Sequence, residues 1–333
     1  MAIEIVLFII GIALTFDFFN GFHDAANSIA TVVSTGVLPP RSAVLWAAFF
    51  NFVAAFGFGV SVASTIGKGI VVTAFVTQWL VLATLIGAIT WDVVTWWFGL
   101  PTSSSHALVG GLLGAGLVAG GSGAIQTGGL TTIAIFIVLS PLIGVLVAIG
   151  LILVTTRIAM RVPRPKANRT FRRLQLLSAA AFSLGHGTND AQKTMGIIAV
   201  LLFTQGYLGK TFFVPFYVVL LAHAAIGLGT YFGGWRIVRT MGMRITKLHP
   251  FGGFSAETAA ASTLFATAHF GIPVSTTHTI AGAIIGVGAT RRLSAVRWGV
   301  AQRIVWAWIL TIPASAAISA VIYAFLRFGL GLI

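Results

Sequence analysis

Two segments of the sequence place hydroxyl side chains directly after a proline and before an apolar stretch. They are PTSSSH at 101–106 and PVSTTH at 273–278. A proline turn followed by Ser or Thr is typical of the start of a helix, where backbone N–H groups have no partner within the helix. Those N–H groups, the hydroxyls and the positive end of the helix dipole together suit an oxyanion. The candidate anion ligands are Ser103, Ser104, Ser275, Thr276 and Thr277.

Two further segments place a carboxylate and amides inside long apolar stretches. They are NGFHDAAN at 20–27 and HGTNDAQK at 186–193. Carboxylate and amide oxygens are ligands of hard cations. An unpaired Asp at the centre of a membrane helix costs about 2.5–3.5 kcal/mol, so such a residue is a functional candidate. An anion site beside a cation or proton site is what an anion symporter requires. The candidate ligands of the coupling ion are Asp24, Asn27, Asn189 and Asp190.

Basic side chains accompany both kinds of segment. Lys193 is the only Lys or Arg in the interior of an expected span, and its place three residues after Asp190 favours contact with that carboxylate or with the substrate. Each polar group also has a structural alternative, because Ser and Thr in membrane helices often bond neighbouring helices or their own backbone. The four histidines of these segments can act as ligands or as supporting donors: His23, His106, His186 and His278.

The elements that position these residues must lie in a membrane. Hydrophobic residues make up 57% of the 333 residues and charged residues 8%, with a mean hydropathy of +1.00, whereas a soluble domain carries about 25% charged residues. Since about 20 apolar residues span a bilayer, we expect an all-α polytopic membrane protein of about ten to twelve membrane helices. The absence of cysteine excludes disulfides and thiolate metal sites. The apolar N-terminal stretch lacks the basic start of a signal peptide, so we expect it to be the first span.

Ten apolar units can be distinguished along the chain. Two of them, 3–36 and 172–203, are too long for one plain span and carry polar residues midway, so we expect them to be broken. The ten units are 3–36, 43–63, 79–98, 106–120, 131–155, 172–203, 211–232, 253–270, 276–290 and 303–326.

Basic residues indicate how the chain is oriented. Sixteen of the 20 Lys and Arg residues lie at Arg41 and in 157–173, 236–247 and 291–303. Because Lys and Arg accumulate in cytoplasmic loops, these positions predict that the N- and C-termini both lie outside. The net charge of +14 is therefore a signal of topology and of contact with anionic lipid, and it does not indicate nucleic-acid binding.

The basic linker 157–173 divides the chain into two halves, 1–156 and 174–333, with five apolar units each. An odd number of units reverses the orientation of the second half, which predicts two inverted-topology repeats. Transporters of that kind bind substrate and ion near the midplane, between the repeats. We therefore expect the two hydroxyl segments to approach one site from opposite faces. The aligned pairs are Gly21 with Gly187, Asp24 with Asp190, Ser103 with Ser275, and His106 with His278.

These segments resemble the inorganic phosphate transporter (PiT) family over nearly the whole chain. Five motifs carry the resemblance: GFHDAANSIATVV, GLPTSSSH, HGTNDAQKTMGI, GFSAE at 253–257 and GIPVSTTH. The resemblance implies a secondary carrier for phosphate uptake in the bacterial cytoplasmic (inner) membrane, with no cofactor beyond the coupling ion. It implies that the Asp and Asn residues of the two signatures bind the coupling ion and that the hydroxyl segments bind phosphate. It also adds Glu257 of GFSAE to the coupling machinery.

The second signature departs from one branch of that family. Gln192 and Lys193 stand where sodium-coupled members often carry Ala-Asn, and a fixed positive charge there would compete with sodium. The pattern is similar to the bacterial low-affinity, proton-coupled type, in which phosphate can travel as a neutral divalent-metal complex. We therefore expect phosphate–proton symport. Sodium coupling and sulfate transport within the same family are the alternatives, and no metal ligands are assigned.

Two classes other than carriers also deserve comparison. Ser, His and Asp are the parts of a nucleophilic site, but an intramembrane hydrolase needs that set once and this chain carries it twice. An anion channel needs a continuous pore lined by rings of like groups. The expected partners are inorganic phosphate, a coupling cation and membrane lipid, and a homodimer fits the symmetry of the bundle.

Overall fold

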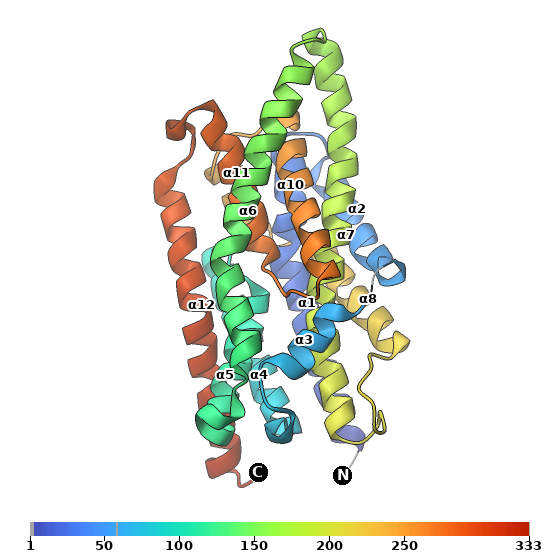
Figure 1. Ribbon diagram of the computed structural model, residues 1–333, viewed down its shortest axis with the longest axis vertical. Helices are drawn as coiled ribbons and strands as arrows, with labels where there is room; N and C mark the ends of the chain where they lie inside the picture. Colours follow the sequence, from blue (N-terminus) through green and yellow to red (C-terminus); the bar gives the residue numbers. More distant parts are fainter. Residues whose placement is uncertain (1–2, 58, 333) are drawn as a thin grey trace.

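A computed structural model describes residues 3–57 and 59–332, and within them the only non-helical pairing is an isolated bridge between Val71 and Ile125. The helices form one elongated bundle (Figure 1). This arrangement confirms the predicted all-α class. The helices are α1 (Ile3–Ser34), α2 (Pro40–Val53), α3 (Ser61–Gly69), α4 (Gln78–Phe98), α5 (Ser104–Gly120), α6 (Thr127–Ala159), α7 (Arg164–Thr204), α8 (Phe216–Phe232), α9 (Trp235–Arg239), α10 (Pro250–His269), α11 (Thr276–Arg291) and α12 (Trp298–Ala324).

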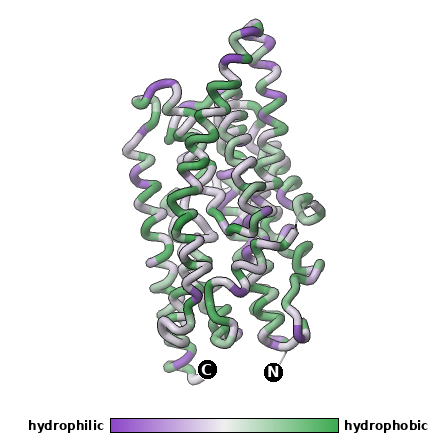
Figure 2. Tube along the Cα trace, viewed as in Figure 1, coloured by the Kyte–Doolittle hydropathy of each residue, from purple (hydrophilic) through white to green (hydrophobic). Residues whose placement is uncertain are grey.

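The bundle has the lengths and the polarity of a membrane protein. Five helices of the described chain are long and apolar enough to cross a membrane, and seven spans result if each of two bent helix pairs counts as one. Hydrophilic residues gather at the tip that joins α6 to α7 (Figure 2). Both termini lie at the opposite end of the molecule from that tip (Figure 1). The predicted linker 157–173 is mostly helical, because it ends α6 and begins α7.

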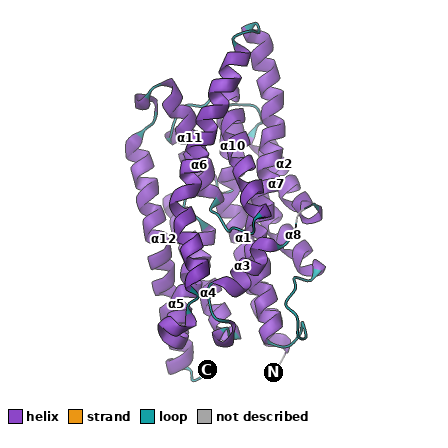
Figure 3. Ribbon diagram, viewed as in Figure 1, coloured by secondary structure: helices purple, strands orange, loops and turns teal. Residues whose placement is uncertain are grey.

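Two helical hairpins carry the hydroxyl segments. α4 and α5 lie in the lower half of Figure 1, and α10 and α11 lie in the upper half. The loops that turn each hairpin are short (Figure 3), and each carries a glycine of positive φ near its start, Gly99 at 66° and Gly271 at 67°. Glycine adopts this left-handed conformation without a Cβ clash, so it can end a helix and reverse the chain. The hydroxyl segments therefore enter the bundle from opposite ends.

The predicted interruptions of the first and sixth apolar units are wrong. α1 and α7 run through both Asp-containing signatures as continuous helices. The glycines of the signatures serve close packing instead of a break: a Cβ at Gly21 would lie 2.1 Å from the Ile226 carbonyl oxygen, and one at Gly187 would lie 2.6 Å from the Asn51 carbonyl oxygen. The sharp bends occur elsewhere, with 84° between the α2 and α3 segments and 62° between the α8 and α9 segments.

The last helix of each half packs on the hairpin of the other half, α12 on α5 and α6 on α11. Glycines allow both contacts. A Cβ at Gly114 of α5 would lie 1.9 Å from the Ala316 carbonyl oxygen, and one at Gly286 of α11 would lie 2.6 Å from the Val145 carbonyl oxygen. Each half thus contributes its last helix to the packing of the other half's hairpin. This matched pairing agrees with the predicted inverted repeat, which stays a prediction.

Candidate functional site

Each hydroxyl segment begins a helix inside the bundle. The Ser103 hydroxyl caps α5 by accepting from the backbone N–H of His106 at 3.3 Å. The Ser275 hydroxyl caps α11 by accepting from the backbone N–H of His278 at 3.1 Å. Two of the predicted phosphate ligands therefore stabilise the helix starts in this conformation. Ser104, by contrast, is buried and its hydroxyl has no partner among the described residues.

The first signature meets the hairpin of the second half. The Thr277 hydroxyl of α11 donates to the Asp24 carboxylate of α1 at 3.5 Å and accepts from the Asn27 amide at 2.9 Å. His23 Nδ1 lies 2.9 Å from the other Asp24 oxygen, and its Nε2 lies 3.1 Å from the Thr95 hydroxyl of α4. His23, Asp24 and Asn27 lie on α1, whereas Thr95 lies on α4 and Thr277 on α11. This cluster therefore joins α1 to α4 and α11.

The second signature meets both hairpins. The Thr276 hydroxyl donates to the Asp190 carboxylate at 2.9 Å. Lys193 forms an ion pair with the same carboxylate and donates to the Ser105 hydroxyl at 2.5 Å and the Val274 carbonyl at 2.9 Å. An ammonium has three N–H donors, so these three acceptors satisfy Lys193. The predicted contact with Asp190 is present. Ser105 and the Val274 carbonyl lie within the two hydroxyl segments, but sequence alone does not show which group of a segment faces Lys193.

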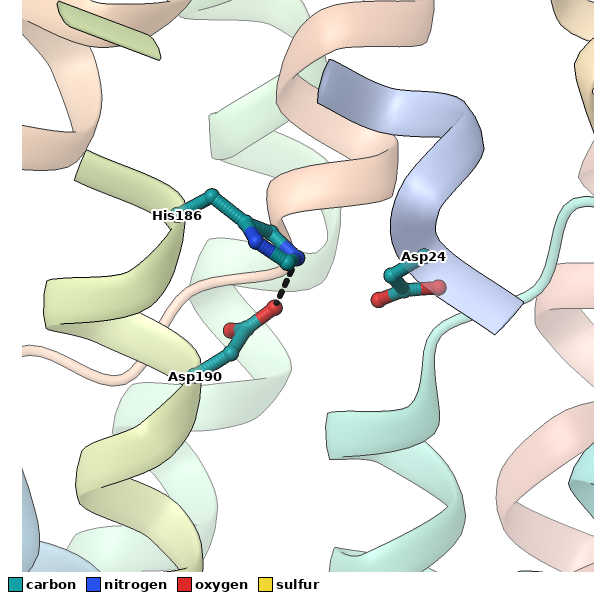
Figure 4. A group of neighbouring side chains, drawn as sticks. All are labelled: Asp24, His186 and Asp190. Atoms are coloured by element: carbon teal, nitrogen blue, oxygen red, sulfur yellow. Dashed lines mark ion pairs between the residues drawn. The ribbon is translucent and has the colours of Figure 1, made fainter. Parts of the chain in front are cut away.

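The two signature carboxylates and one histidine face a common space. The possible ligand atoms of Asp24, His186 and Asp190 all lie within 4.8 Å of one another, and all three residues are buried. His186 Nε2 lies 3.2 Å from Asp190, and Asp24 faces this pair from α1 (Figure 4). His186 Nδ1 is 3.2 Å from the Asn51 side-chain oxygen. Two carboxylates and an imidazole can bind a divalent cation, so this trio is a candidate for the metal of a metal–phosphate complex.

The two histidines that follow the hydroxyls lie together. The rings of His106 and His278 meet edge to face, with centroids 4.6 Å apart. His278 also stacks on Trp308 at 3.7 Å, and its Nδ1 lies 2.7 Å from the Ser275 hydroxyl. These contacts favour a supporting role, since both rings brace the helix starts of the two hairpins against each other.

Glu257 lies in a separate polar cluster. Its carboxylate accepts from the hydroxyl of Thr31 at 2.5 Å, the amide of Gln175 at 3.0 Å and the hydroxyl of Ser178 at 2.5 Å. The structure thus places this predicted coupling residue among α1, α7 and α10, where its hydrogen-bond partners are Thr31, Gln175 and Ser178 and not the signature carboxylates. Its three partners were not predicted, because none of them lies within the paired segments 20–27, 186–193, 101–106 and 273–278.

Some buried polar atoms of the site have no hydrogen-bond partner among the described residues. They include both side-chain polar atoms of Asn189 and the side-chain oxygen of Asn27, in residues that are at most 1% exposed. Buried polar groups are nearly always hydrogen-bonded. The unpaired atoms therefore mark where a bound ion or substrate would find ligands.

Residues 20–319 match the model of the phosphate transporter family. The chain belongs to this family. It is 60% identical to a probable low-affinity inorganic phosphate transporter of Rhizobium meliloti and 42% identical to one of Bacillus subtilis, with 97% of each chain covered in both comparisons.

A solved structure has the same fold. The chain is similar to a structure described as the sodium-dependent phosphate transporter, with a TM-score of 0.87, 28% identity, and 98% and 99% of the two chains covered. The resemblance to the phosphate transporter family is thereby confirmed. The protein is a multi-span phosphate transporter and not an enzyme, so the hydrolase alternative falls.

Proposed function

We propose that this phosphate transporter is a symporter that imports inorganic phosphate together with protons across the bacterial cytoplasmic membrane. One observation carries the proposal: Thr276 and Thr277, at the tip of one hairpin, donate hydrogen bonds to the signature carboxylates Asp190 and Asp24 of two different helices. The same hydroxyls that would bind phosphate are thus occupied by the groups that would bind the coupling ion.

This arrangement links the two binding events. While Asp24 is ionised, it accepts from the Thr277 hydroxyl and adds a negative charge beside the helix starts. A proton on Asp24 removes that charge and weakens the carboxylate as an acceptor, because charge-assisted hydrogen bonds are the stronger ones. The hydroxyl can then donate to a phosphate oxygen, which also meets the N–H groups at the starts of α5 and α11. Ion and anion therefore bind together more readily than either binds alone.

Translocation follows from burial and from the two hairpins. The side chains of Asp24, Asp190 and Lys193 are at most 2% exposed, so the site is closed to both ends in this conformation. We propose that the two inverted repeats rearrange around this site so that it opens alternately outside, where the termini lie, and inside, where the α6–α7 tip lies. The N-terminus outside and the repeat symmetry are both parts of this proposal.

Sodium coupling is the second candidate, because the similar solved structure is described as sodium-dependent. Proton coupling is favoured because the Lys193 ammonium forms an ion pair with Asp190, and this fixed positive charge would compete with a sodium ion there. The metal–phosphate complex is a further form of the substrate, supported by the Asp24, His186 and Asp190 trio.

The deciding experiment is uptake of radiolabelled phosphate into proteoliposomes under imposed proton or sodium gradients, with excess unlabelled sulfate as competitor. Uptake that follows the proton gradient and resists sulfate supports the proposal. Uptake that follows only sodium replaces the coupling ion, and loss of uptake to sulfate replaces the substrate. Uptake that rises with added divalent cation at a fixed proton gradient supports the metal–phosphate complex.

A further inference from the structure

The alignment of the two signatures places Lys193 opposite Asn27. Asp24 aligns with Asp190, and three residues further on, α1 carries Asn27 where α7 carries Lys193. In the hydroxyl segments, the alignment of Ser103 with Ser275 likewise places Ser105 opposite Thr277. Each half thus combines one signature carboxylate with one hydroxyl from the other half, but only one of the two combinations includes a basic side chain at the aligned position.

On the α7 side, Lys193 is bound as a cation would be. Its ammonium contacts one carboxylate, one hydroxyl and one backbone carbonyl, those of Asp190, Ser105 and Val274. All three are oxygen ligands, the kind that bind small hard cations. The Lys193 side chain is 1% exposed and among the largest fully buried side chains of the described chain, so the ammonium has no route to water in this conformation.

On the α1 side, the same geometry lacks the ammonium. The Thr277 hydroxyl lies 3.5 Å from an Asp24 oxygen, matching the 3.5 Å from the Ser105 hydroxyl to Asp190. The side-chain oxygen of Asn27 is buried and has no partner among the described residues. His23 contacts the other Asp24 oxygen, as His186 contacts Asp190, so the histidines do not distinguish the two sides.

We propose that the Lys193 ammonium is a built-in cation that permanently fills the α7-side site, so that only the α1-side site of Asp24, Asn27 and Thr277 exchanges a cation during transport. The inference rests on the proposed symport. On this inference, Lys193 sets the number of cations transported with each phosphate, and it is not a phosphate ligand. A transporter with an empty α7-side site would need one more free cation for each phosphate.

The test is the variant Lys193→Gln, reconstituted in proteoliposomes, with sodium chloride added at equal concentration on both sides of the membrane. In the wild type, this sodium leaves proton-driven phosphate uptake unchanged. In Lys193→Gln without sodium, uptake falls at least about tenfold, because Asp190 is left as a buried charge without its partner. Sodium restores that uptake in a saturable manner. If the wild type itself uses sodium, Lys193→Gln shows a steeper dependence on sodium concentration.

Lys68→Gln is the matched control, because Lys68 is exposed and lies over the ring of Phe212 at 4.3 Å. Its uptake stays at the wild-type level and does not respond to sodium. The inference is overturned if Lys193→Gln unfolds at the same temperature as Lys68→Gln and no sodium concentration restores its phosphate uptake. It is also overturned if Lys193→Gln shows full uptake in the absence of sodium.

A second variant decides the case if Lys193→Gln does not fold. Lys193→Gln combined with Asp190→Asn removes both charges, so nothing on the α7 side then requires a cation. The inference predicts phosphate uptake without added sodium and phosphate affinity within a few-fold of the wild type. Loss of phosphate binding in this double variant identifies Lys193 as a substrate ligand and overturns the inference. Failure of the wild type to take up phosphate is a different result, and it refutes the proposed function.

Discussion

Replacing Thr277 by valine tests the link between the hydroxyls and the carboxylates. Valine keeps the shape of threonine but loses the hydroxyl, which accepts from Asn27 at 2.9 Å and donates to Asp24 at 3.5 Å. The second distance is at the limit for a hydrogen bond, so most of the loss comes from Asn27. That amide keeps its contact with the Thr276 hydroxyl at 3.3 Å and is not left wholly unpaired. The free energy of unfolding of this conformation therefore falls by about 1–2 kcal/mol.

In the proposed mechanism the same hydroxyl donates to a phosphate oxygen once Asp24 is protonated, and losing that donor costs about 1–2 kcal/mol of binding, or about a 5- to 30-fold weaker binding of phosphate. Isothermal titration calorimetry of the purified transporter at fixed pH measures it directly. The matched control is Thr279→Val, because the Thr279 hydroxyl lies on the same helix, is equally buried, and donates only to the Ser275 carbonyl one turn before it, at 2.9 Å. We expect Thr279→Val to bind phosphate within a few-fold of the wild type. Equal losses in the two variants would refute the reasoning, because the site would then not depend on this hydroxyl.

Three further predictions test the site and the packing. Asp24→Asn should abolish coupled phosphate uptake without reducing expression in membranes, and Asp190→Asn should abolish it while also leaving the buried Lys193 ammonium without its carboxylate; normal uptake by both would move the coupling site elsewhere. Ser275→Ala should lower the free energy of unfolding by about 1 kcal/mol through loss of the helix cap, measured by thermal unfolding in detergent; an unchanged melting temperature would show that the hydroxyl is free for substrate. Gly114→Ala should lower the melting temperature strongly, because its Cβ would lie 1.9 Å from a carbonyl oxygen of α12, while Gly150→Ala, with no neighbour within 4 Å, should not.

The sequence allowed the site to be predicted where two signals coincided. The signatures that contain Asp24 and Asp190 are unusual in composition, and so are the hydroxyl segments, one of which contains Thr276 and Thr277. Both kinds of segment also recur in the two halves. The structure brings these residues into direct contact. Ser105 was passed over because it stands within the same hydroxyl run as Ser103 and Ser104, and only the start of α5 decides which of the three side chains faces Asp190.

The helix interruptions could not be predicted for a related reason. Polar residues and glycines within an apolar stretch are compatible with a broken helix and with a continuous helix packed closely on polar partners. In α1, Gly21 meets a backbone carbonyl and Asn27 meets two hydroxyls of α11. Those partners come from the second half of the chain. Local sequence cannot show them, so local sequence favoured a break that packing makes unnecessary.

The crossed packing of the last helices has a consequence for synthesis. The Ser315 hydroxyl of α12 donates to the Ala107 carbonyl at the start of α5, 208 residues earlier in the chain. The hairpin of α4 and α5 therefore enters the lipid well before the ribosome has made the helix that covers it. Until then, the face of α5 that carries Gly110 and Gly114 lacks the helix that packs on it. A chain that stops before α12 would leave that face uncovered in the bilayer, where membrane proteases and chaperones can recognise it as unfinished.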